Sequence, residues 1–290
     1  MSNRLGIIVE TRYLRQAMPG AVIRVFRGRG IAADVICPRD SRFSPERGIL
    51  RNENGTEFNL NEYDAIISRN RNPLGLAMLA YADLAGILTI NSHSSVQRVR
   101  NKAKMGIALT LAGIRCAPTF LADHASVLAG LTTDFFPLIL KATYGDNSQG
   151  LRLIRSPEDL NDLHWGNDLV LAQQFLPSDG FDLKLYVCGN IVHAVRKPSP
   201  VNGDPSAPAE IIRPDATMVD LALRCGEVFG LDIYGVDTIM TADGPVVIEV
   251  NDFPNFTGIP GADEMIADYI LGRIVSRKES IAAERASAVG

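Results

Sequence analysis

The stretch IYGVDTIMTADGPVVIEVND, residues 233–252, contains two apolar runs separated by a short polar segment. Both runs are rich in β-branched residues, and the Ala-Asp-Gly between them is typical of a turn, so the stretch predicts a β-hairpin. Asp237 lies in the first run. Glu249 and Asn251 lie two positions apart in the second, where side chains face the same side of a sheet. These oxygens suit Mg²⁺, which proteins usually hold through one or two carboxylates together with substrate phosphates. The alternative is a set of polar residues at the exposed rim of a sheet.

An apolar run, FFPLILK at residues 135–141, ends on Lys141 and leads directly into the segment YGDNSQG. Ser148 and Gly150 lie in this segment, whose glycines allow backbone N–H groups to approach a ligand closely. A lysine beside such a loop suits phosphate oxygens, because its ammonium neutralises their charge. The spacing differs from the P-loop motif GxxxxGK[ST], which the sequence lacks, and a simple exposed loop is the alternative.

Two further segments could contact a nucleotide. Lys102 lies in VRNKAKMG, within a run that predicts one long helix from Ser94 to Leu111, capped by Ser94 or Ser95. A lone lysine on a helix is more often solvated than bound to a ligand. The segment QQFL, residues 173–176, ends a predicted strand before a turn, where backbone groups could hydrogen-bond a heterocyclic base.

Composition and charge exclude several classes of function. The chain has 290 residues, of which 46% are apolar and 21% charged, an ordinary globular composition that corresponds to one large domain or a few smaller ones. The net charge of −4 argues against general nucleic-acid binding, and no apolar run approaches the roughly 20 residues of a membrane span. Four widely spaced cysteines predict reduced thiols in a cytoplasmic protein. The charge is uneven, since residues 1–104 carry 16 basic and 9 acidic residues, whereas residues 105–290 carry 13 and 24.

In this order the motifs resemble the ATP-grasp superfamily, and within it the RimK/LysX-like amino-acid ligases, over roughly residues 65–272. NKAKM resembles the D-K motif of that family, with Asn101 in place of the aspartate. LILKATYGDNSQG resembles its strand lysine and glycine-rich loop. LAQQFLPSDGFDLKLYVCGN resembles its Q-E-[FY]-I motif followed by D-I-R, with Gln174 in place of the glutamate and Lys184 in place of the arginine. GVDTIM and VVIEVNDFPNF resemble its metal-binding end.

The resemblance implies an α/β protein of the ATP-grasp fold. An N-terminal parallel α/β domain, residues 1–92, would precede two α+β subdomains, residues 93–175 and 176–290, that clasp ATP. It implies ATP and Mg²⁺ as cofactors, with two ions expected and Mn²⁺ as an alternative metal. The implied nucleotide contacts are Lys102, Lys141, Ser148, Gly150, Gln174, Phe175, Leu176, Asp182 and Lys184; the metal ligands are Asp237, Glu249 and Asn251; the catalytic pair is Arg196 and Lys197; the substrate contacts are Arg69, Arg71 and Asn255.

The implied reaction is the ATP-dependent joining of a carboxylate to an amine through an acyl phosphate. The partners would be a small anionic substrate, a carboxylate or phosphate, and an amine acceptor, with no nucleic acid and no membrane. The basic first third supports this reading, because its strand-end arginines, such as Arg69 and Arg71, lie where α/β sheets bind ligands and would attract an anion. The chain could also assemble with further copies of itself into a homo-oligomer.

The sequence departs from the ligase pattern after the basic pair Arg196-Lys197. These residues, adjacent in one strand, should face opposite ways. The RimK-like loop F-R-x-N-x-x-x-G-G is replaced by PSPVNGDPSAPAE. HAVRKPS and VNDFPNFTGIP instead resemble the inositol polyphosphate kinase branch of the superfamily, which phosphorylates a hydroxyl directly. A small-molecule kinase and a non-catalytic ATP-binding module are therefore the alternatives to a ligase.

Overall fold

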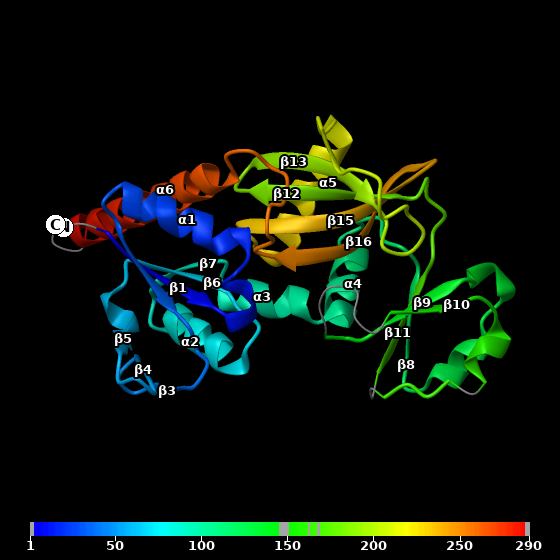
Figure 1. Cartoon of the computed structure of the whole chain (residues 1–290), viewed down its shortest axis with the longest axis horizontal. Coiled ribbons are helices and arrows are strands. Elements are labelled where there is room, and N and C mark those ends of the chain that lie inside the picture. The colour runs from blue at the N-terminus through cyan, green and yellow to red at the C-terminus, as the bar shows by residue number, and fades with distance from the viewer. Residues whose placement is uncertain (1–2, 145–150, 162, 167–168, 288–290) are drawn as a thin grey trace.

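The computed structural model describes residues 3–144, 151–161, 163–166 and 169–287, and within these ranges the strands form four sheets. Figure 1 shows an N-terminal sheet at one end of the molecule, a middle sheet at the other end, and a C-terminal sheet along the upper part of the view. The fourth sheet is a small one beside the N-terminal sheet. The helices of the described ranges are too short or too polar to span a bilayer. The four cysteines are free thiols, as predicted.

The N-terminal sheet consists of parallel strands in the order β2-β1-β6-β7, as the alternation of strand-like and helical runs predicts. The elements here are β1 (Arg4–Val9), β2 (Ala32–Ile36), β6 (Ala65–Arg69), β7 (Leu88–Ile90), α1 (Ala17–Gly28), α2 (Pro73–Leu84) and α6 (Ala262–Ser287). Side chains of β1 alternate between its faces, so Leu5 and Ile7 pack with α1 and α6, whereas Ile8 packs with α2. Because helices cover both faces, these strands are mostly apolar.

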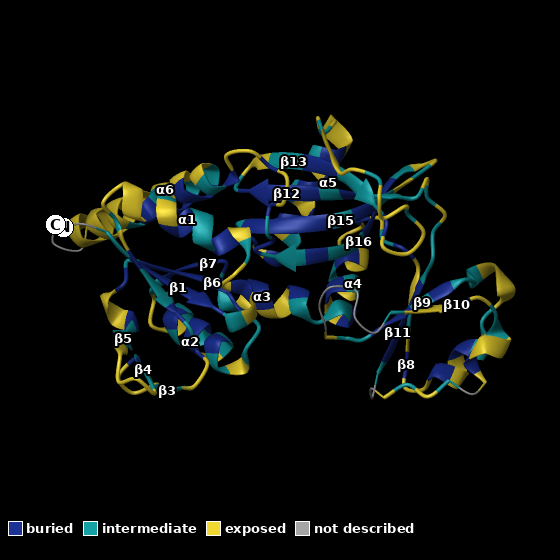
Figure 2. Cartoon of the chain, viewed as in Figure 1, coloured by how far each residue is buried: buried dark blue, intermediate teal, exposed yellow. Residues whose placement is uncertain are grey.

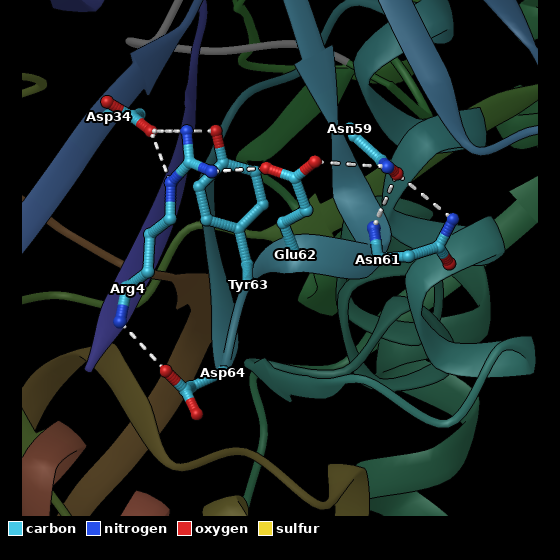
Figure 3. A network of polar contacts seen from close by, with 7 residues as sticks. All are labelled: Arg4, Asp34, Asn59, Asn61, Glu62, Tyr63 and Asp64. Carbon is cyan, nitrogen blue, oxygen red and sulfur yellow. Dashed lines mark hydrogen bonds and ion pairs between the residues drawn. The ribbon is translucent and has the colours of Figure 1, made fainter. Parts of the chain in front are cut away.

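A small antiparallel sheet fills the connection between β2 and β6. Its strands are β3 (Ser41–Ser44), β4 (Ile49–Asn52) and β5 (Glu57–Asn59), and their three or four residues carry too little pattern to be predicted. Polar contacts tie this region to the parallel sheet (Figure 3). Arg4 donates from Nη2 to Asp34 at 2.9 Å and from its backbone N–H to Asp64 at 2.8 Å. The Tyr63 hydroxyl donates to the same Asp34 at 3.0 Å, so one carboxylate joins three segments of the chain.

The middle sheet is antiparallel, in the order β10-β9-β11-β8, and has a separate core of its own. Its strands are β8 (Thr119–Ala122), β9 (Leu138–Lys141), β10 (Arg152–Ile154) and β11 (Val170–Gln174). Two 3-10 helices, Ala125–Gly130 and Pro157–Leu160, accompany these strands. These short helices cover one face of the sheet, so its other face is available to the neighbouring C-terminal sheet.

The C-terminal sheet is antiparallel, in the order β14-β13-β12-β15-β16, and contains the predicted hairpin of residues 233–252 and a second hairpin formed by β12 and β13. Its elements are β12 (Phe181–Cys188), β13 (Ile191–Pro198), β14 (Glu210–Ile212), β15 (Ile233–Thr241), β16 (Gly244–Asp252) and the covering helix α5 (Ala216–Phe229). On β12, Leu183 and Leu185 face the core under α5, so Asp182 and Lys184 face the other side. That second face carries the polar residues of both hairpins.

The single helix predicted from Ser94 to Leu111 is instead two helices, α3 (His93–Arg100) and α4 (Lys102–Leu111). Asn101 between them has an extended backbone, with φ −88° and ψ 103°, and its side chain accepts a hydrogen bond from the Lys104 N–H. An Asn that caps a helix start competes with helix continuation, which is why the apolar periodicity did not reveal the break. The N-cap of α3 is also different from that expected, since Ser92 accepts from the Ser95 N–H.

Asn91 and helix α6 are among the contacts that join the N-terminal sheet to the C-terminal sheet. Asn91, buried at the end of β7, accepts from the backbone N–H groups of Asp232 (2.7 Å) and Ile233 (2.9 Å) and donates to the Ile233 carbonyl at 2.7 Å. Its amide thus pairs with the start of β15 as a neighbouring strand would. The first half of α6 packs against α1, whereas beyond Ile274 most of this helix is exposed (Figure 2).

Candidate active site

Two cavities meet on the polar face of the C-terminal sheet. The first cavity lies between this sheet and the middle sheet, and the second lies between it and the N-terminal part of the chain. Lys197, Asp237 and Glu249 line both cavities and therefore mark the place where they meet. The second cavity has a volume of about 460 Å³, inside the ~300–1,000 Å³ range of small-molecule sites.

Two lysines from different elements project into the first cavity. Lys102 is the first residue of α4, and its ammonium forms an ion pair with the Glu249 carboxylate. Lys141, the last residue of β9, is buried and donates to Gln173 Oε1 at 2.6 Å. Burial lowers the pKa of Lys141 to about 8, although the Glu249 carboxylate acts in the opposite direction. The loop residues Ser148 and Gly150, which were expected beside Lys141, lie outside the described residues.

The two carboxylates at the meeting point come from opposite strands of one hairpin. Asp237 on β15 pairs with Glu249 on β16, next to a shift in the strand register. Asn251 Nδ2 donates to Asp237 Oδ2 at 2.9 Å, and Lys184 Nζ lies 3.0 Å from Asp237 Oδ1. Oδ1 is buried and ion-paired with this ammonium but has no hydrogen bond, whereas the ammonium donates to Oδ2 at 3.4 Å.

This set of oxygens fits a hard divalent cation. A buried carboxylate oxygen of Asp237 without a hydrogen bond lies beside a second carboxylate, Glu249, and the amide of Asn251. Among the described residues, however, no group of three or more His, Cys, Asp and Glu side chains is placed to hold a metal. The donor set therefore fits Mg²⁺ that shares its coordination with phosphate oxygens and water, rather than an ion enclosed by protein ligands alone.

The segment expected to bind adenine lines the first cavity. Gln174, Phe175 and Leu176 continue from the end of β11 along the cavity wall. The backbone N–H groups of Gln174 and Phe175 donate to the carbonyls of Pro118 and Pro137, both at 2.8 Å. A base bound here would therefore have to use other backbone groups of the segment.

Two of the expected nucleotide contacts on β12, Asp182 and Lys184, line different cavities. Asp182 lines the first cavity, and burial raises the pKa of its carboxyl. Lys184, two residues later on the same face, lines the second cavity and not the first. Burial lowers the pKa of Lys184, but the Asp237 carboxylate more than offsets this, so the pKa is raised and the amine stays charged. Lys184 thus lies with Asp237 on the wall of the second cavity.

The two side chains of the basic pair on β13 point to opposite faces of the sheet, as strand geometry requires. Lys197 lines both cavities. Arg196 lies elsewhere: its Nη2 is 2.8 Å from Asp179 Oδ2, and its guanidinium lies 3.5 Å from the centre of the Phe181 ring. Arg196 is not among the described residues that line the two cavities, because adjacent side chains on a strand point to opposite faces.

Arg69 has the contacts of a structural support. It is 9% exposed, and it donates to the Phe253 carbonyl and to Gln16 Oε1, which joins β6 to the segment after β16. Its guanidinium also lies 4.9 Å from the centre of the Tyr13 ring. Burial lowers the pKa of Arg69 to about 10. Arg69 lines the second cavity while holding its walls together.

The other two expected substrate contacts also line the second cavity. The backbone N–H of Arg71 donates to Glu10 Oε2 at 2.9 Å. Asn255 Oδ1 accepts from the backbone N–H of Met18 at 3.0 Å, which holds the start of α1 against the C-terminal part of the chain.

Two residues at the cavities were not expected from the sequence. Gln173 contacts Lys141, and strand alternation could have revealed it, because Leu171 pairs with Lys141 and Gln173 lies two positions further on the same face. Arg100, the last residue of α3, lines the second cavity, while Lys102 lines the first. The helix break at Asn101 lies between these two cations, which line different cavities.

Comparison with known proteins identifies a related family. The sequence matches the model of the RimK-like ATP-grasp domain over residues 99–271. It is 29% identical over 237 residues to a ribosomal protein bS6–L-glutamate ligase of Salmonella schwarzengrund (strain CVM19633), which covers 74% of this chain and 76% of that protein. The corresponding ligase of Salmonella paratyphi B (strain ATCC BAA-1250 / SPB7) is 28% identical over the same shares.

Solved structures show the same fold. A RimK domain ATP-grasp protein from Sphaerobacter thermophilus DSM 20745 has a TM-score of 0.72 at 21% identity, covering 92% of this chain and 98% of that one. The ATP-grasp ligase PsnB, complexed with precursor peptide PsnA2 and AMPPNP, has a TM-score of 0.70 at 17% identity over 94% and 99%. D-cycloserine synthetase DcsG has a TM-score of 0.69 at 18% identity over 94% and 100%. The expected ATP-grasp fold is confirmed.

Proposed function

The chain belongs to the RimK-like ATP-grasp family, and from this premise we propose that it is an ATP-dependent carboxylate–amine ligase. One observation carries the proposal. A cavity that holds two lysines meets a cavity walled by arginines at Lys197, Asp237 and Glu249. Phosphoryl transfer needs positioned cations around the phosphate more than covalent help from protein, and this junction supplies them.

ATP would occupy the first cavity. Lys102 and Lys141 would neutralise phosphate oxygens, and the segment Gln174–Leu176 would hold the base. The cavity has a volume of about 150 Å³ among the described residues, below the ~300 Å³ at which small-molecule sites begin. Nucleotide binding would therefore require the middle sheet to move away from the C-terminal sheet. The separate core of the middle sheet is consistent with such a motion.

Asp237, Glu249 and Asn251 would hold divalent metal at the phosphate end. We propose two Mg²⁺ ions with Glu249 as the shared ligand, and Mn²⁺ as an effective replacement. The metal would neutralise charge on the transferred phosphate. Lys102 would then exchange its ion pair with Glu249 for a phosphate oxygen, and Lys184 would lose its partner Asp237 to the metal.

The acid substrate would enter from the second cavity. Its carboxylate oxygen attacks the γ-phosphorus of ATP, ADP leaves, and an acyl phosphate forms. The amine then attacks the carbonyl carbon, phosphate leaves with the bonding electron pair, and the nitrogen loses a proton to solvent. Lys197 at the junction would stabilise charge on the phosphate in both steps. Arg196, paired with Asp179, would not take part.

A hydroxyl kinase of the inositol phosphate type would use the same nucleotide site, so trapping the product distinguishes the two. The protein is incubated with ATP, Mg²⁺, a panel of carboxylic acids and hydroxylamine. Hydroxylamine captures an acyl phosphate as a hydroxamate, which the ligase proposal expects together with ADP. A stable phosphoester without hydroxamate would identify a kinase instead.

The variant Glu249→Gln tests whether the site is catalytic at all. Removal of this carboxylate should reduce ADP formation at least 100-fold, roughly the loss of one or two charge-assisted contacts in the transition state. Asp243→Asn, at the exposed turn of the same hairpin, is the matched control and should leave turnover unchanged. Equal turnover in wild type and Glu249→Gln would favour a non-catalytic nucleotide-binding module.

A further inference from the structure

Lys141, Gln173 and Thr119 form a row across three neighbouring strands of the middle sheet. Leu171 of β11 lies opposite Lys141 of β9, and Gln173, two positions further along β11, faces the same side. Gln173 in turn lies directly opposite Thr119 of β8. The three polar side chains therefore share one face of the sheet, and Lys141 and Gln173 line the first cavity.

The hydrogen bonds along this row fix the orientation of the Gln173 amide. The Thr119 hydroxyl donates its single proton to the Ala117 carbonyl at 2.9 Å, so toward Gln173 this hydroxyl can only accept. Gln173 Nε2 therefore faces Thr119, at 3.4 Å, and Oε1 faces the Lys141 ammonium, at 2.6 Å. The reverse orientation of the amide would bring its N–H groups against the ammonium, which also only donates.

Both members of the Lys141–Gln173 contact are buried, each with 7% of its surface exposed. A buried ammonium is costly unless it is paired or hydrogen-bonded, and the Gln173 oxygen supplies a hydrogen bond. Burial lowers the pKa of Lys141 to about 8, although the carboxylates of Glu249, Asp237 and Asp182 all act to raise it. These carboxylates therefore do not offset the cost of burying the charge.

The two lysines of the first cavity are thus held in different ways. Lys102 is ion-paired with the Glu249 carboxylate, so its charge is matched by a full negative charge in contact with it. Lys141 is held by an amide, which is a hydrogen-bond acceptor without net charge. A phosphate oxygen has to compete with a carboxylate at Lys102, whereas at Lys141 it meets an oriented ammonium whose charge is available.

We propose that Gln173 is a positioning residue for ATP: its neutral amide directs the Lys141 ammonium into the first cavity and leaves the positive charge for a phosphate group. The inference rests on the proposed function, since it takes the first cavity as the ATP site. Gln173 acts through Lys141 rather than on the nucleotide itself. A carboxylate at this position would keep the hydrogen bond but neutralise the charge that phosphate requires.

Replacement of Gln173 by its charged isostere tests this role. The affinity for ATP is measured by calorimetry, and that for adenosine, which lacks phosphate, by ligand-observed NMR, both at neutral pH without Mg²⁺. In Gln173→Glu the Kd for ATP should rise at least ~10-fold, because an ion pair with Lys141 competes with phosphate, while the Kd for adenosine should change less than about twofold. Gln97→Glu adds the same charge at an exposed position of α3 and should change neither value.

A double substitution determines whether Gln173 acts through Lys141. Gln173→Met removes the acceptor without adding charge and should raise the Kd for ATP about 3- to 10-fold. In a Lys141→Met background the same change should have less than about a twofold further effect, because the group to be positioned is gone. Equal losses in both backgrounds would mean that Gln173 only supports the sheet. Thermal denaturation checks that each variant is folded, and Gln173→Met carries the test if Gln173→Glu does not fold.

The outcomes separate this inference from the ligase proposal. Unchanged ATP affinity in the folded variants, or an equal loss of affinity for ATP and adenosine, would overturn the positioning role and leave the ligase proposal intact. If the expected losses of ATP affinity occur but hydroxylamine traps no acyl phosphate, the positioning role stands and the ligase proposal fails. A wild-type protein that binds no ATP would overturn both.

Discussion

The ammonium of Lys102 forms an ion pair with the carboxylate of Glu249, which links the start of α4 to the C-terminal half of β16. Both side chains are proposed to contact other ligands during catalysis, the lysine a phosphate and the carboxylate a metal ion. The ion pair therefore competes with both. In the absence of these ligands, the two opposite charges neutralise each other within the cavity.

Substitution of Lys102 should separate these two effects. In Lys102→Met the affinity for ATP should fall roughly 10- to 100-fold, because one charge-assisted contact to phosphate is lost. The affinity for Mn²⁺ without nucleotide should rise, because Glu249 no longer has a competing partner. Calorimetry with nucleotide and electron paramagnetic resonance with Mn²⁺ measure the two affinities. Lys104→Met, on the exposed side of the same helix, is the control, and a parallel loss of both affinities would argue against the competition.

Lys141 should make nucleotide binding depend on pH. Burial lowers its pKa to about 8, so its charge is lost as the pH rises through this value, and ATP affinity should fall between about pH 7 and 9. Phosphate would raise this pKa, so binding above pH 8 should take up a proton, which calorimetry in two buffers detects. Lys141→Arg should abolish both effects, because arginine stays charged. The same pH dependence in this variant would mean that another group is responsible.

The same lowered pKa has a consequence for stability. Between about pH 8 and the ordinary value of 10.5, the unfolded chain keeps a proton on Lys141 that the folded chain has released. Stability rises with pH wherever the unfolded state binds more protons, so this lysine should make the protein more stable as the pH increases across that window. Denaturation of wild type and Lys141→Met at several pH values measures the difference between their free energies of unfolding. This difference should become smaller toward the upper end of that pH window.

Lys184 should affect the substrate of the second cavity rather than the nucleotide. It lines that cavity, and its ammonium lies 3.0 Å from Asp237 Oδ1. In Lys184→Met the KM for the acid or amine should rise about 10-fold, while the Kd for ATP measured without metal should change less than about twofold. A selective loss of ATP affinity would instead support the nucleotide role expected from the sequence.

Asn91 should be important for stability rather than for catalysis. Its amide makes three hydrogen bonds to the backbone of Asp232 and Ile233, so Asn91→Ala would leave these groups unsatisfied between the two sheets. The free energy of unfolding should decrease by about 2–4 kcal/mol, whereas alanine at the exposed Asn54 should cost under about 0.5 kcal/mol. Urea denaturation measures both values, and a similar small loss in each would show that this joint is weak.

The strands and hairpins of the site were largely predictable from the sequence. Asp237, Glu249 and Lys141 interrupt or end apolar runs, and the polar residues in such runs identify a face with a function. The alternation rule also separated Lys197 from Arg196 correctly in space. These features depend on local pattern, which a single sequence retains.

Features that depend on contacts between distant segments were not predictable. The break at Asn101 lies within a periodic run, so the pattern predicts one helix where the structure has two. Nothing local shows that Arg69 donates to the carbonyl of Phe253, which lies 184 positions further along the chain. Lys184 lines the second cavity, whose other wall comes from the N-terminal part of the chain. The sequence of β12 does not encode where that part lies.

The most direct test of the ligase proposal follows one oxygen atom. The acid that best supports ADP formation is labelled with ¹⁸O in its carboxylate and incubated with ATP, Mg²⁺ and an amine, and the released phosphate is examined by mass spectrometry. An acyl phosphate transfers one carboxylate oxygen to phosphorus, so each inorganic phosphate should carry one ¹⁸O atom, and Glu249→Gln should release almost none. Inorganic phosphate without the label, or a phosphoester in its place, would contradict the account.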